Sequence, residues 1–238
     1  MKVAVIIPAL DEELSIGPVV KQPADAVRDC GDLPTVVVVD NGSRDATRAR
    51  ARSAGATVID EPKRGYGRAC LTGIAALPAN IDVVLFADGD GSDDPAFVGA
   101  LLAPIRNGKA DLVIGSRERG ARVGLVEKGA LTSAQRFGNQ LAGVILAVAY
   151  FQPTTDLGPF RAIDKDALLR LRMDDEGFGW TVQMQARAAR AGLRTAEIAV
   201  AYRKRRFGTS KVSGDLKASA HAGAVILWTL AREAVRRR

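Results

Sequence analysis

The strongest chemical signal in the sequence is a pair of carboxylates, Asp88 and Asp90, that follows an apolar run. Two ionised carboxylates at the end of a buried strand repel each other and are costly to remove from water unless a cation lies between them. Hard divalent cations such as Mg²⁺ and Mn²⁺ prefer oxygen ligands, and such an ion also neutralises a departing diphosphate. The alternative is a turn that caps the next helix, but Asp93 and Asp94 directly before Pro95 fit capping better. The pair therefore predicts a metal-assisted phosphate site.

Two further carboxylates, Glu12 and Asp40, follow the first and second apolar runs. Such acids can accept hydrogen bonds from ribose hydroxyls or base N–H groups, although the segment 40–43 is also a good turn. The first run is followed by Pro8 and Leu10 rather than by Gly-x-Gly-x-x-Gly, and no Gly-x-x-x-x-Gly-Lys-Ser/Thr loop occurs. These absences disfavour a dinucleotide-dependent oxidoreductase and a P-loop enzyme.

Positive charge is concentrated in the last fifth of the chain. The net charge of the 238 residues is +7, and residues 190–238 contribute 12 Lys or Arg against 3 Asp or Glu. This balance fits a solvated basic tail, a nucleic-acid surface, or a surface for anionic lipid or phosphate. The single histidine, His221, and the two cysteines argue against a zinc site and a disulfide framework.

These side chains must be positioned by short apolar strands that alternate with helical segments. The runs are continuous in Val and Ile, which is typical of parallel strands buried on both faces. We expect an α/β sheet flanked by helices, whose ligands bind beyond the carboxyl ends of the strands. The predicted strands are Val3–Ile7, Val36–Val39, Thr57–Ile59, Val83–Phe86, Leu112–Ile114, Asp156–Ala162 and Thr195–Ala201; the predicted helices are Ile16–Val27, Ala46–Ala54, Gly67–Ala76, Pro95–Ile105, Ala130–Tyr150, Trp180–Ala191 and Asp215–Arg237; residues 118–130 are predicted to be a mobile loop and 202–213 a basic loop.

In their order along the chain, these motifs resemble the family 2 glycosyltransferases, and within them the dolichyl-phosphate mannose synthase and polyprenyl-phosphate glucosyltransferase group. The matching segments are Val5–Ala9 with Glu12-Glu13, Val38–Asp45, Gly65–Ala69, Asp88–Ser92, Gly115–Arg117, Thr155–Arg161 and Gly208–Lys211. The resemblance implies a GT-A type fold, with a Rossmann-like mostly parallel sheet and a C-terminal acceptor-side extension, as one domain over residues 1–238. It also implies inverting hexose transfer, with 1–117 as the nucleotide-sugar half and 118–238 as the acceptor half.

By position, the resemblance implies three groups of site residues. The first binds the nucleotide, the second faces the diphosphate and a Mg²⁺ or Mn²⁺ ion, and the third receives the acceptor phosphate or closes over the diphosphates. Ser92 and Asp93 stand where many relatives carry Gln or His, so no third metal ligand is assigned. In that order the groups are Pro8, Ala9, Glu12, Asp40 and Gly65; Asp88 and Asp90; and Arg117, Arg136, Arg205, Ser210 and Lys211.

The acceptor decides whether a catalytic base is needed. A phosphate monoester is anionic near neutral pH and can attack the sugar without losing a proton, so it needs only positioned positive charge, as Arg117 and Arg136 would supply. A neutral hydroxyl would require a carboxylate base. Asp156 is the candidate base, because it stands where other members of the family place an acid near the acceptor. Its alternative role is to cap the turn into Gly158.

We therefore expect a metal-dependent transferase that moves a hexose from GDP-mannose or UDP-glucose to a polyprenyl phosphate. The second hypothesis is the same fold acting on a small soluble hydroxyl acceptor. A nucleotide-sugar pyrophosphorylase is disfavoured because its Gly-x-Gly-x-Arg loop is absent, and a nucleic-acid-binding protein because acidic strand ends repel phosphate. No segment shows a secretory signal pattern or reaches the ~20 apolar residues of a spanning helix. We expect a cytoplasmic enzyme that touches the inner face of the plasma membrane and does not bind nucleic acid, with a homodimer as one assembly to consider.

Overall fold

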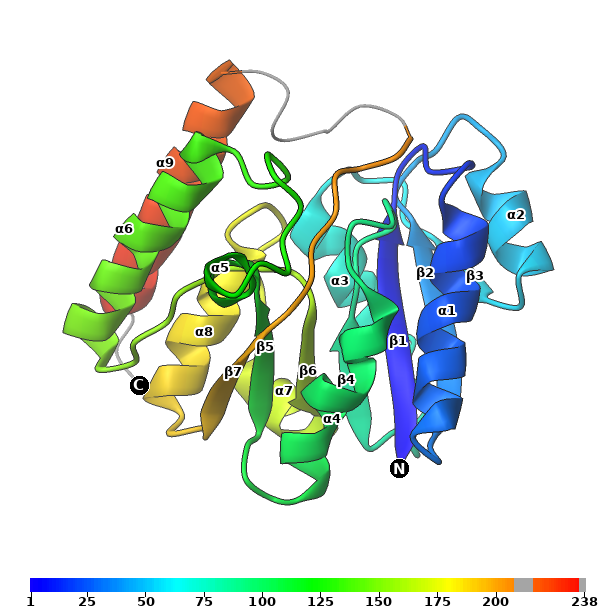
Figure 1. Ribbon diagram of the computed structural model, residues 1–238, viewed down its shortest axis with the longest axis horizontal. Coiled ribbons are helices and arrows are strands. Elements are labelled where there is room, and N and C mark those ends of the chain that lie inside the picture. Colours follow the sequence, from blue (N-terminus) through cyan, green and yellow to red (C-terminus); the bar gives the residue numbers. More distant parts are fainter. Residues whose placement is uncertain (208–215, 236–238) are drawn as a thin grey trace.

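A seven-stranded sheet forms the centre of the molecule, in the order β3-β2-β1-β4-β6-β5-β7 (Figure 1). The computed structural model describes residues 1–207 and 216–235, with the backbone alone described for 216–222. Strand β6 pairs antiparallel with β4 and β5, whereas the other strand pairs are parallel. The strands are β1 (Lys2–Ala9), β2 (Leu33–Asp40), β3 (Thr57–Asp60), β4 (Val83–Phe86), β5 (Leu112–Ser116), β6 (Arg161–Asp164) and β7 (Thr195–Ala199). The predicted mostly parallel α/β sheet is confirmed.

Helices cover both faces of the sheet, because successive residues of each strand point to opposite sides. On one face, Val3, Val5 and Ile7 of β1 pack with α1 and α4, and on the other face Ala4 and Ile6 pack with α3, α7 and α8. The helices are α1 (Ile16–Asp29), α2 (Thr47–Ser53), α3 (Tyr66–Ala75), α4 (Val98–Arg106) after a 3₁₀ turn (Pro95–Phe97), α5 (Arg117–Arg122), α6 (Ser133–Tyr150), α7 (Lys165–Leu171), α8 (Trp180–Arg190) and α9 (Leu216–Val235).

The segment 118–130, predicted to be a mobile loop, contains helix α5 and is corrected here. The side chain of Ser116 accepts a hydrogen bond from the backbone N–H of Arg119 and so caps the first turn of α5. Helix α7 was not predicted, although Asp164 caps it in the same way through the N–H of Ala167. Both caps are Ser or Asp residues at the end of a short strand, where the sequence pattern of a helix is too brief to stand out.

Helices α6 and α9 lie side by side at one end of the molecule (Figure 1). Their inner sides pack on α8 through Ala142, Leu146, Val182, Ala186 and Leu230. None of the helices in the described ranges is long and apolar enough to cross a membrane.

The segment 200–207 after β7, here called the strap, leads to the carboxyl end of β1 (Figure 1). It is held by its backbone: the N–H of Arg203 donates to the carbonyl oxygen of Ser92 at 2.9 Å, and that of Glu127 donates to the carbonyl of Tyr202 at 2.9 Å. The strap therefore brings residues from the last fifth of the chain next to the loop that carries Asp88 and Asp90.

Candidate active site

A cavity of about 780 Å³ opens beyond the carboxyl ends of the strands, where an α/β sheet usually binds its ligand. Most of the predicted site residues line it: Pro8, Ala9, Glu12, Gly65, Asp88, Asp90, Arg117 and Arg205. The residues that line the cavity do not include Asp40, Arg136 or Asp156. Ser210 and Lys211 lie outside the described residues. The structure thus gathers side chains separated by almost 200 positions in the sequence.

Three carboxylates, those of Asp88, Asp90 and Asp93, share the loop after β4. The backbone N–H of Asp88 donates to Oδ2 of Asp93 at 3.1 Å, and Oδ1 of Asp93 is buried with no hydrogen-bond partner in the part of the chain that the structure describes. Burial, followed by the charges of Asp93 and Asp90, raises the pKa of Asp88 well above its usual range. Burial likewise raises the pKa of Asp93 to about 7. This loop concentrates negative charge that a cation would relieve.

Of the two residues predicted to cap the next helix, Asp93 and Asp94, only one does so. Asp94 caps the 3₁₀ turn, because its side chain accepts a hydrogen bond from the N–H of Ala96 at 3.1 Å. Asp93 does not cap it but turns back to Asp88, so its expected capping role is wrong. Only one of two adjacent acids can occupy the N-cap position, which leaves the other for the site.

Arg205 of the strap lies between two of the site acids. Its guanidinium is 2.7 Å from Oε1 of Glu12 and 3.3 Å from Oδ2 of Asp90, and its side chain is mostly buried. Burial raises the pKa of Glu12, and the charge of Arg205 opposes that rise. Because the positive charge of Arg205 already lies beside Glu12 and Asp90, the surroundings of these acids are compatible with a cation.

The residues present fit a divalent metal that also binds a diphosphate. Within the described ranges, no group of three or more His, Cys, Asp and Glu side chains is arranged to hold a metal by itself. Mg²⁺ commonly binds through one or two carboxylates together with substrate phosphates. Asp88 and Asp90 would supply the protein ligands, and the metal would neutralise charge on the leaving diphosphate.

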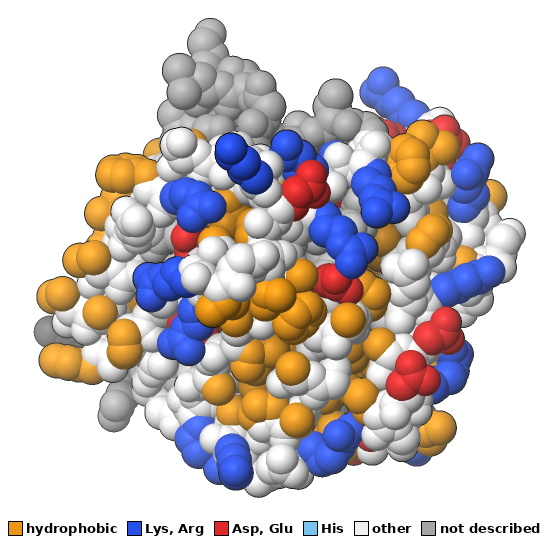
Figure 2. Space-filling model, viewed as in Figure 1, with side chains coloured by type: hydrophobic (Ala, Val, Ile, Leu, Met, Phe, Trp, Pro, Cys, Tyr) orange, Lys and Arg blue, Asp and Glu red, His pale blue; other side chains and the backbone are white. Residues whose placement is uncertain are grey.

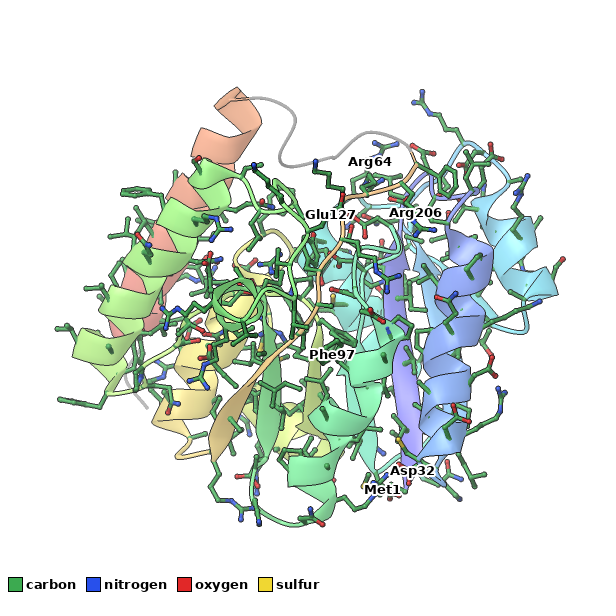
Figure 3. The ribbon with its side chains drawn as sticks, in the orientation of Figure 1. Met1, Asp32, Arg64, Phe97, Glu127 and Arg206 are labelled. Atoms are coloured by element: carbon green, nitrogen blue, oxygen red, sulfur yellow. The ribbon has the colours of Figure 1, made fainter. Side chains whose placement is uncertain are left out.

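The opposite side of the cavity is formed by residues around the ends of β1, β2 and α3. Asp40 ends β2 and is buried; its Oδ2 accepts a hydrogen bond from the N–H of Ser43 at 3.1 Å, while Oδ1 has no hydrogen-bond partner among the described residues. The side chain of Asn41 accepts a hydrogen bond from the N–H of Gly65 at 2.8 Å and so fixes the start of α3. A side chain at Gly65 would lie 2.3 Å from the carbonyl oxygen of Glu176, so only glycine fits. Arg64 lines this side, and Figure 3 shows it at the same end of the sheet as Arg206.

Arg117 and Asp156 form a buried bidentate ion pair. Nε and Nη2 of Arg117 donate to the two carboxylate oxygens of Asp156 at 2.8 and 2.7 Å, and the backbone N–H of Arg117 donates to Oδ2 at 2.7 Å. The guanidinium also lies over the ring of Tyr202, 5.1 Å from its centroid. The carboxylate of Asp156 therefore binds the guanidinium of Arg117. It fixes Arg117 rather than capping the turn into Gly158, which was its expected alternative role.

Arg136 lies near the start of α6, outside the cavity lining. Its Nη1 donates to Glu118 of α5 at 3.1 Å, and Asn139 one turn later donates to the other oxygen of Glu118 at 3.3 Å. The side chain of Arg136 remains 43% exposed, so one ion pair does not enclose it. Sequence reasoning missed Glu118, whose partner lies on a different helix.

Another network that sequence reasoning missed supports the loop before β6. The side chain of Glu197 of β7 is only 5% exposed and accepts hydrogen bonds from Thr154 and from the backbone and side chain of Thr155. Arg161 is also buried and donates to the carbonyl oxygens of Leu157, Gly158 and Thr181. These contacts hold Asp156 in place for Arg117. No local sequence signal links β7 to this loop, because the pairing arises only when the sheet forms.

Comparison with known proteins identifies the family of the chain. The family model described as glycosyl transferase family 2 matches residues 4–170. An uncharacterized glycosyltransferase of Mycobacterium tuberculosis is 35% identical over 217 residues, covering 91% of this chain and 92% of the relative. The undecaprenyl-phosphate mannosyltransferase of Micrococcus luteus is 31% identical and covers 97% and 95%.

Solved structures give the same fold. The crystal structure of glucosyl-3-phosphoglycerate synthase from Mycobacterium tuberculosis, in complex with Mn²⁺, UDP and phosphoglyceric acid, superposes with a TM-score of 0.75 at 22% identity and covers 100% of this chain and 80% of that one. The mostly parallel sheet flanked by helices is thus the GT-A arrangement. Since the family model spans most of the chain and two relatives match almost all of it, the chain belongs to glycosyl transferase family 2.

Proposed function

We propose that this glycosyltransferase moves a hexose from a nucleoside-diphosphate sugar to a polyprenyl phosphate, with inversion and with a divalent metal. The observation that carries the proposal is one cavity that joins an acidic centre to cationic side chains and to an apolar wall. Asp88 and Asp90 lie at one side, Arg117 and Arg205 face the interior, and Gly138 of α6 and Ile226 of α9 line another part. Such a site suits a molecule with two anionic groups and a hydrocarbon chain.

The pairing of Asp156 supports a phosphate acceptor. Both of its carboxylate oxygens accept hydrogen bonds from Arg117, so in this arrangement it is poorly placed to remove a proton. A phosphate acceptor needs no base: its oxygen attacks the anomeric carbon, the bond from that carbon to the diphosphate oxygen breaks, and the nucleoside diphosphate leaves with the electron pair. Arg117 and Arg136 would offset the repulsion between the acceptor and the donor diphosphate.

The two halves of the chain would divide this work. Residues 1–117 would bind the donor through Pro8, Ala9, Glu12, Asp40 and Gly65, and residues 118–238 would bind the acceptor. Neighbouring solved structures hold UDP with Mn²⁺ or Mg²⁺, which supports a nucleotide donor and a divalent metal here. The undecaprenyl-phosphate mannosyltransferase of Micrococcus luteus supports the lipid acceptor.

A small soluble acceptor is the second candidate. The glucosyl-3-phosphoglycerate synthase of Mycolicibacterium smegmatis is 36% identical over 112 residues, 43% of this chain. In that case the cationic side chains would hold an anionic group of a small acid, and Asp156 would have to leave Arg117 to act as a base.

The test is a transfer assay with defined substrates. GDP-mannose and UDP-glucose are each incubated with Mn²⁺ or Mg²⁺ and either a short-chain prenyl phosphate or 3-phosphoglycerate, and the products are identified by mass spectrometry. We expect a glycosyl prenyl phosphate of inverted anomeric configuration. Transfer to 3-phosphoglycerate alone would contradict the lipid-phosphate proposal and support the second candidate.

A further inference from the structure

The outward faces of α6 and α9 expose large apolar side chains that the site does not use. On α6 and its C-cap, the exposed fractions are 66% for Phe137, 61% for Val144, 73% for Val148 and 90% for Phe151; on α9 Trp228 is 69% exposed. Figure 2 shows hydrophobic side chains along the edge of the molecule where these helices lie. Single exposed apolar residues are ordinary, but a continuous set on two adjacent helices marks an interaction surface. We call this surface the α6–α9 face.

Helix α9 packs on the protein through Leu230 but also exposes large apolar side chains. Among its described side chains, the polar Thr229 and the charged Glu233 are buried, whereas Leu227 and Trp228 are exposed. Glu233 accepts hydrogen bonds from Arg187 and Gln183 of α8, so the ionic contacts of α9 face the protein. A helix in water shows the opposite pattern. The outward face of α9 therefore suits an apolar medium.

Helix α6 continues this surface without charge. From Phe137 to Phe151 the sequence contains no Asp, Glu, Lys or Arg. The exposed positions 137, 144, 148 and 151 are separated by seven, four and three residues, a spacing that places them on one side of a helix. Basic residues adjoin the apolar stretch: Arg136 precedes it, and in the sequence three arginines follow Val235 at the end of α9.

The same two helices also form part of the cavity wall. Ala134 and Gly138 of α6 and Gly223 and Ile226 of α9 line the cavity, while other sides of these helices carry the exposed apolar residues. A hydrocarbon chain bound in the cavity would therefore lie against the helices whose outward sides are apolar.

We propose that the α6–α9 face lies on a lipid bilayer with anionic head groups, so that the cavity receives its acceptor from that bilayer. This proposal rests on the lipid-phosphate function proposed above. Burial of the exposed apolar side chains would drive binding, and the adjoining basic residues would add attraction to anionic lipid. Aromatic side chains such as Trp228 are typical of a membrane interface. Figure 2 shows Lys and Arg side chains beside the apolar edge, which favours an anionic lipid surface over a second copy of this face.

Tryptophan fluorescence provides a direct test in the complete chain. The protein has two tryptophans, and Trp180 is fully buried whereas Trp228 is exposed. On mixing with phosphatidylcholine–phosphatidylglycerol vesicles, we expect a blue shift of the emission and co-flotation of the protein. Vesicles of phosphatidylcholine alone should bind more weakly, and salt should reduce binding to the anionic vesicles. Trp228→Phe should keep flotation but lose the blue shift.

A matched pair of variants locates the surface. Val148→Glu places a charge at the centre of the α6–α9 face and should weaken binding to anionic vesicles by about tenfold or more. Leu169→Glu makes the same kind of change on α7, where Leu169 is also exposed, and should bind like the parent. Ala231→Glu on α9 serves as a second variant, and melting temperatures establish that each variant is folded. No vesicle binding by the parent, or parent-like binding by both folded Glu variants of the face, would overturn the proposal.

Two further readouts separate this proposal from its rivals. If the parent is a dimer that does not bind vesicles and Val148→Glu is a monomer, the face is an interface between two copies and the membrane proposal fails. With a short-chain prenyl phosphate in solution, Val148→Glu should turn over like the parent, while its transfer to long-chain acceptor in vesicles should fall. Transfer to prenyl phosphate without vesicle binding would refute only the docking surface; vesicle binding without any such transfer would refute the proposed function.

Discussion

The residues proposed to bind the donor and those proposed to bind the acceptor are positioned in different ways. In the donor half, Ala9 ends β1 and Asp40 ends β2, and the two residues are partners in the register of these parallel strands. Asp88 follows β4 within two residues of its last member. Of the residues proposed to bind the acceptor, Arg117, at the end of the donor half, is fixed by Asp156, 39 residues away, and Arg136 contacts Glu118 of another helix.

The backbone fixes the position of the first group of residues, whereas side-chain contacts fix the position of the second group. Residues at strand ends are placed by the hydrogen-bond ladder of the sheet, which survives most single substitutions. Residues held by buried ion pairs depend on one partner each, and loss of that partner leaves a desolvated charge. We therefore expect substitutions that break a buried ion pair, such as that of Arg117, to change stability and those at the donor strand ends to change activity.

The largest effect on stability is expected from Arg117→Ala. This change leaves the buried carboxylate of Asp156 without its ion pair, which should lower the free energy of unfolding by about 3–5 kcal/mol. Urea denaturation measures the difference. The control is Arg28→Ala, which removes an exposed pair with Asp25 and should cost less than about 1 kcal/mol. Equal losses in the two variants would break the proposed contrast between the halves.

In the donor half, Asp90→Asn should reduce turnover by about 100-fold or more while leaving stability nearly unchanged. The reason is that Asp90 faces the cavity and would hold the metal and diphosphate charge. Asp94→Asn in the same loop is the matched control, because asparagine also caps a helix and turnover should change little. Normal turnover of Asp90→Asn at limiting metal concentration would exclude a metal role for this residue.

Glu233→Gln tests the contribution of a buried ion pair that lies away from the cavity. Its effect on stability is expected to depend on pH. Burial opposes ionisation of Glu233, but hydrogen bonds and charge from Arg187 outweigh it and lower the pKa. The variant should lose about 2 kcal/mol of stability at pH 7, since hydrogen bonds to a charged group are replaced by weaker ones.

A lowered pKa in the folded protein means that the stabilisation by Glu233 is present above its ordinary pKa and is lost as pH falls through the folded value. The difference between parent and Glu233→Gln should therefore shrink in acid, which denaturation at pH 7 and at pH 4 measures. Glu176→Gln, which alters an exposed pair with Arg68, is the control. A difference that grows in acid would contradict the assignment.

Arg136→Ala should act on acceptor binding alone. Because Arg136 is partly exposed and follows Gln135, which lines the cavity, its loss should raise the KM for a short-chain prenyl phosphate by about tenfold, with the donor KM unchanged. Arg122→Ala on α5, also an exposed arginine, is the control. A rise in the donor KM would place Arg136 with the donor half instead.

The smallest effect is expected from Arg205→Ala, at the point where the two halves meet. Arg205 pairs with Glu12 and Asp90, so its removal should raise the affinity for Mn²⁺ in the absence of nucleotide by a few-fold, as measured by calorimetry. Arg203→Ala changes the neighbouring strap residue, which pairs with Asp94, and should leave that affinity unaltered. A weaker affinity for Mn²⁺ in Arg205→Ala would show that Arg205 supports the acids rather than competing with the metal.

The sequence by itself determined the sheet and the donor side of the site. Continuous Val and Ile runs marked the strands, and the polar residues directly after them, among them Glu12, Asp40, Asp88 and Asp90, had to meet at one edge because parallel strands end together. The long helix α6 and the closing helix α9 were equally visible, since each is long enough for its pattern to stand out.

Tertiary structure alone decided how the acceptor side is arranged. The bond between Arg117 and Asp156 and the position of Arg205 between Glu12 and Asp90 join side chains from separate segments, and neither is encoded in local spacing. The same holds for the exposed apolar side chains of α9, which the sequence shows only as a helix with both apolar and charged residues. Local propensity fixes where a strand or helix lies, but which charged groups meet is settled by the free energy of burying them together.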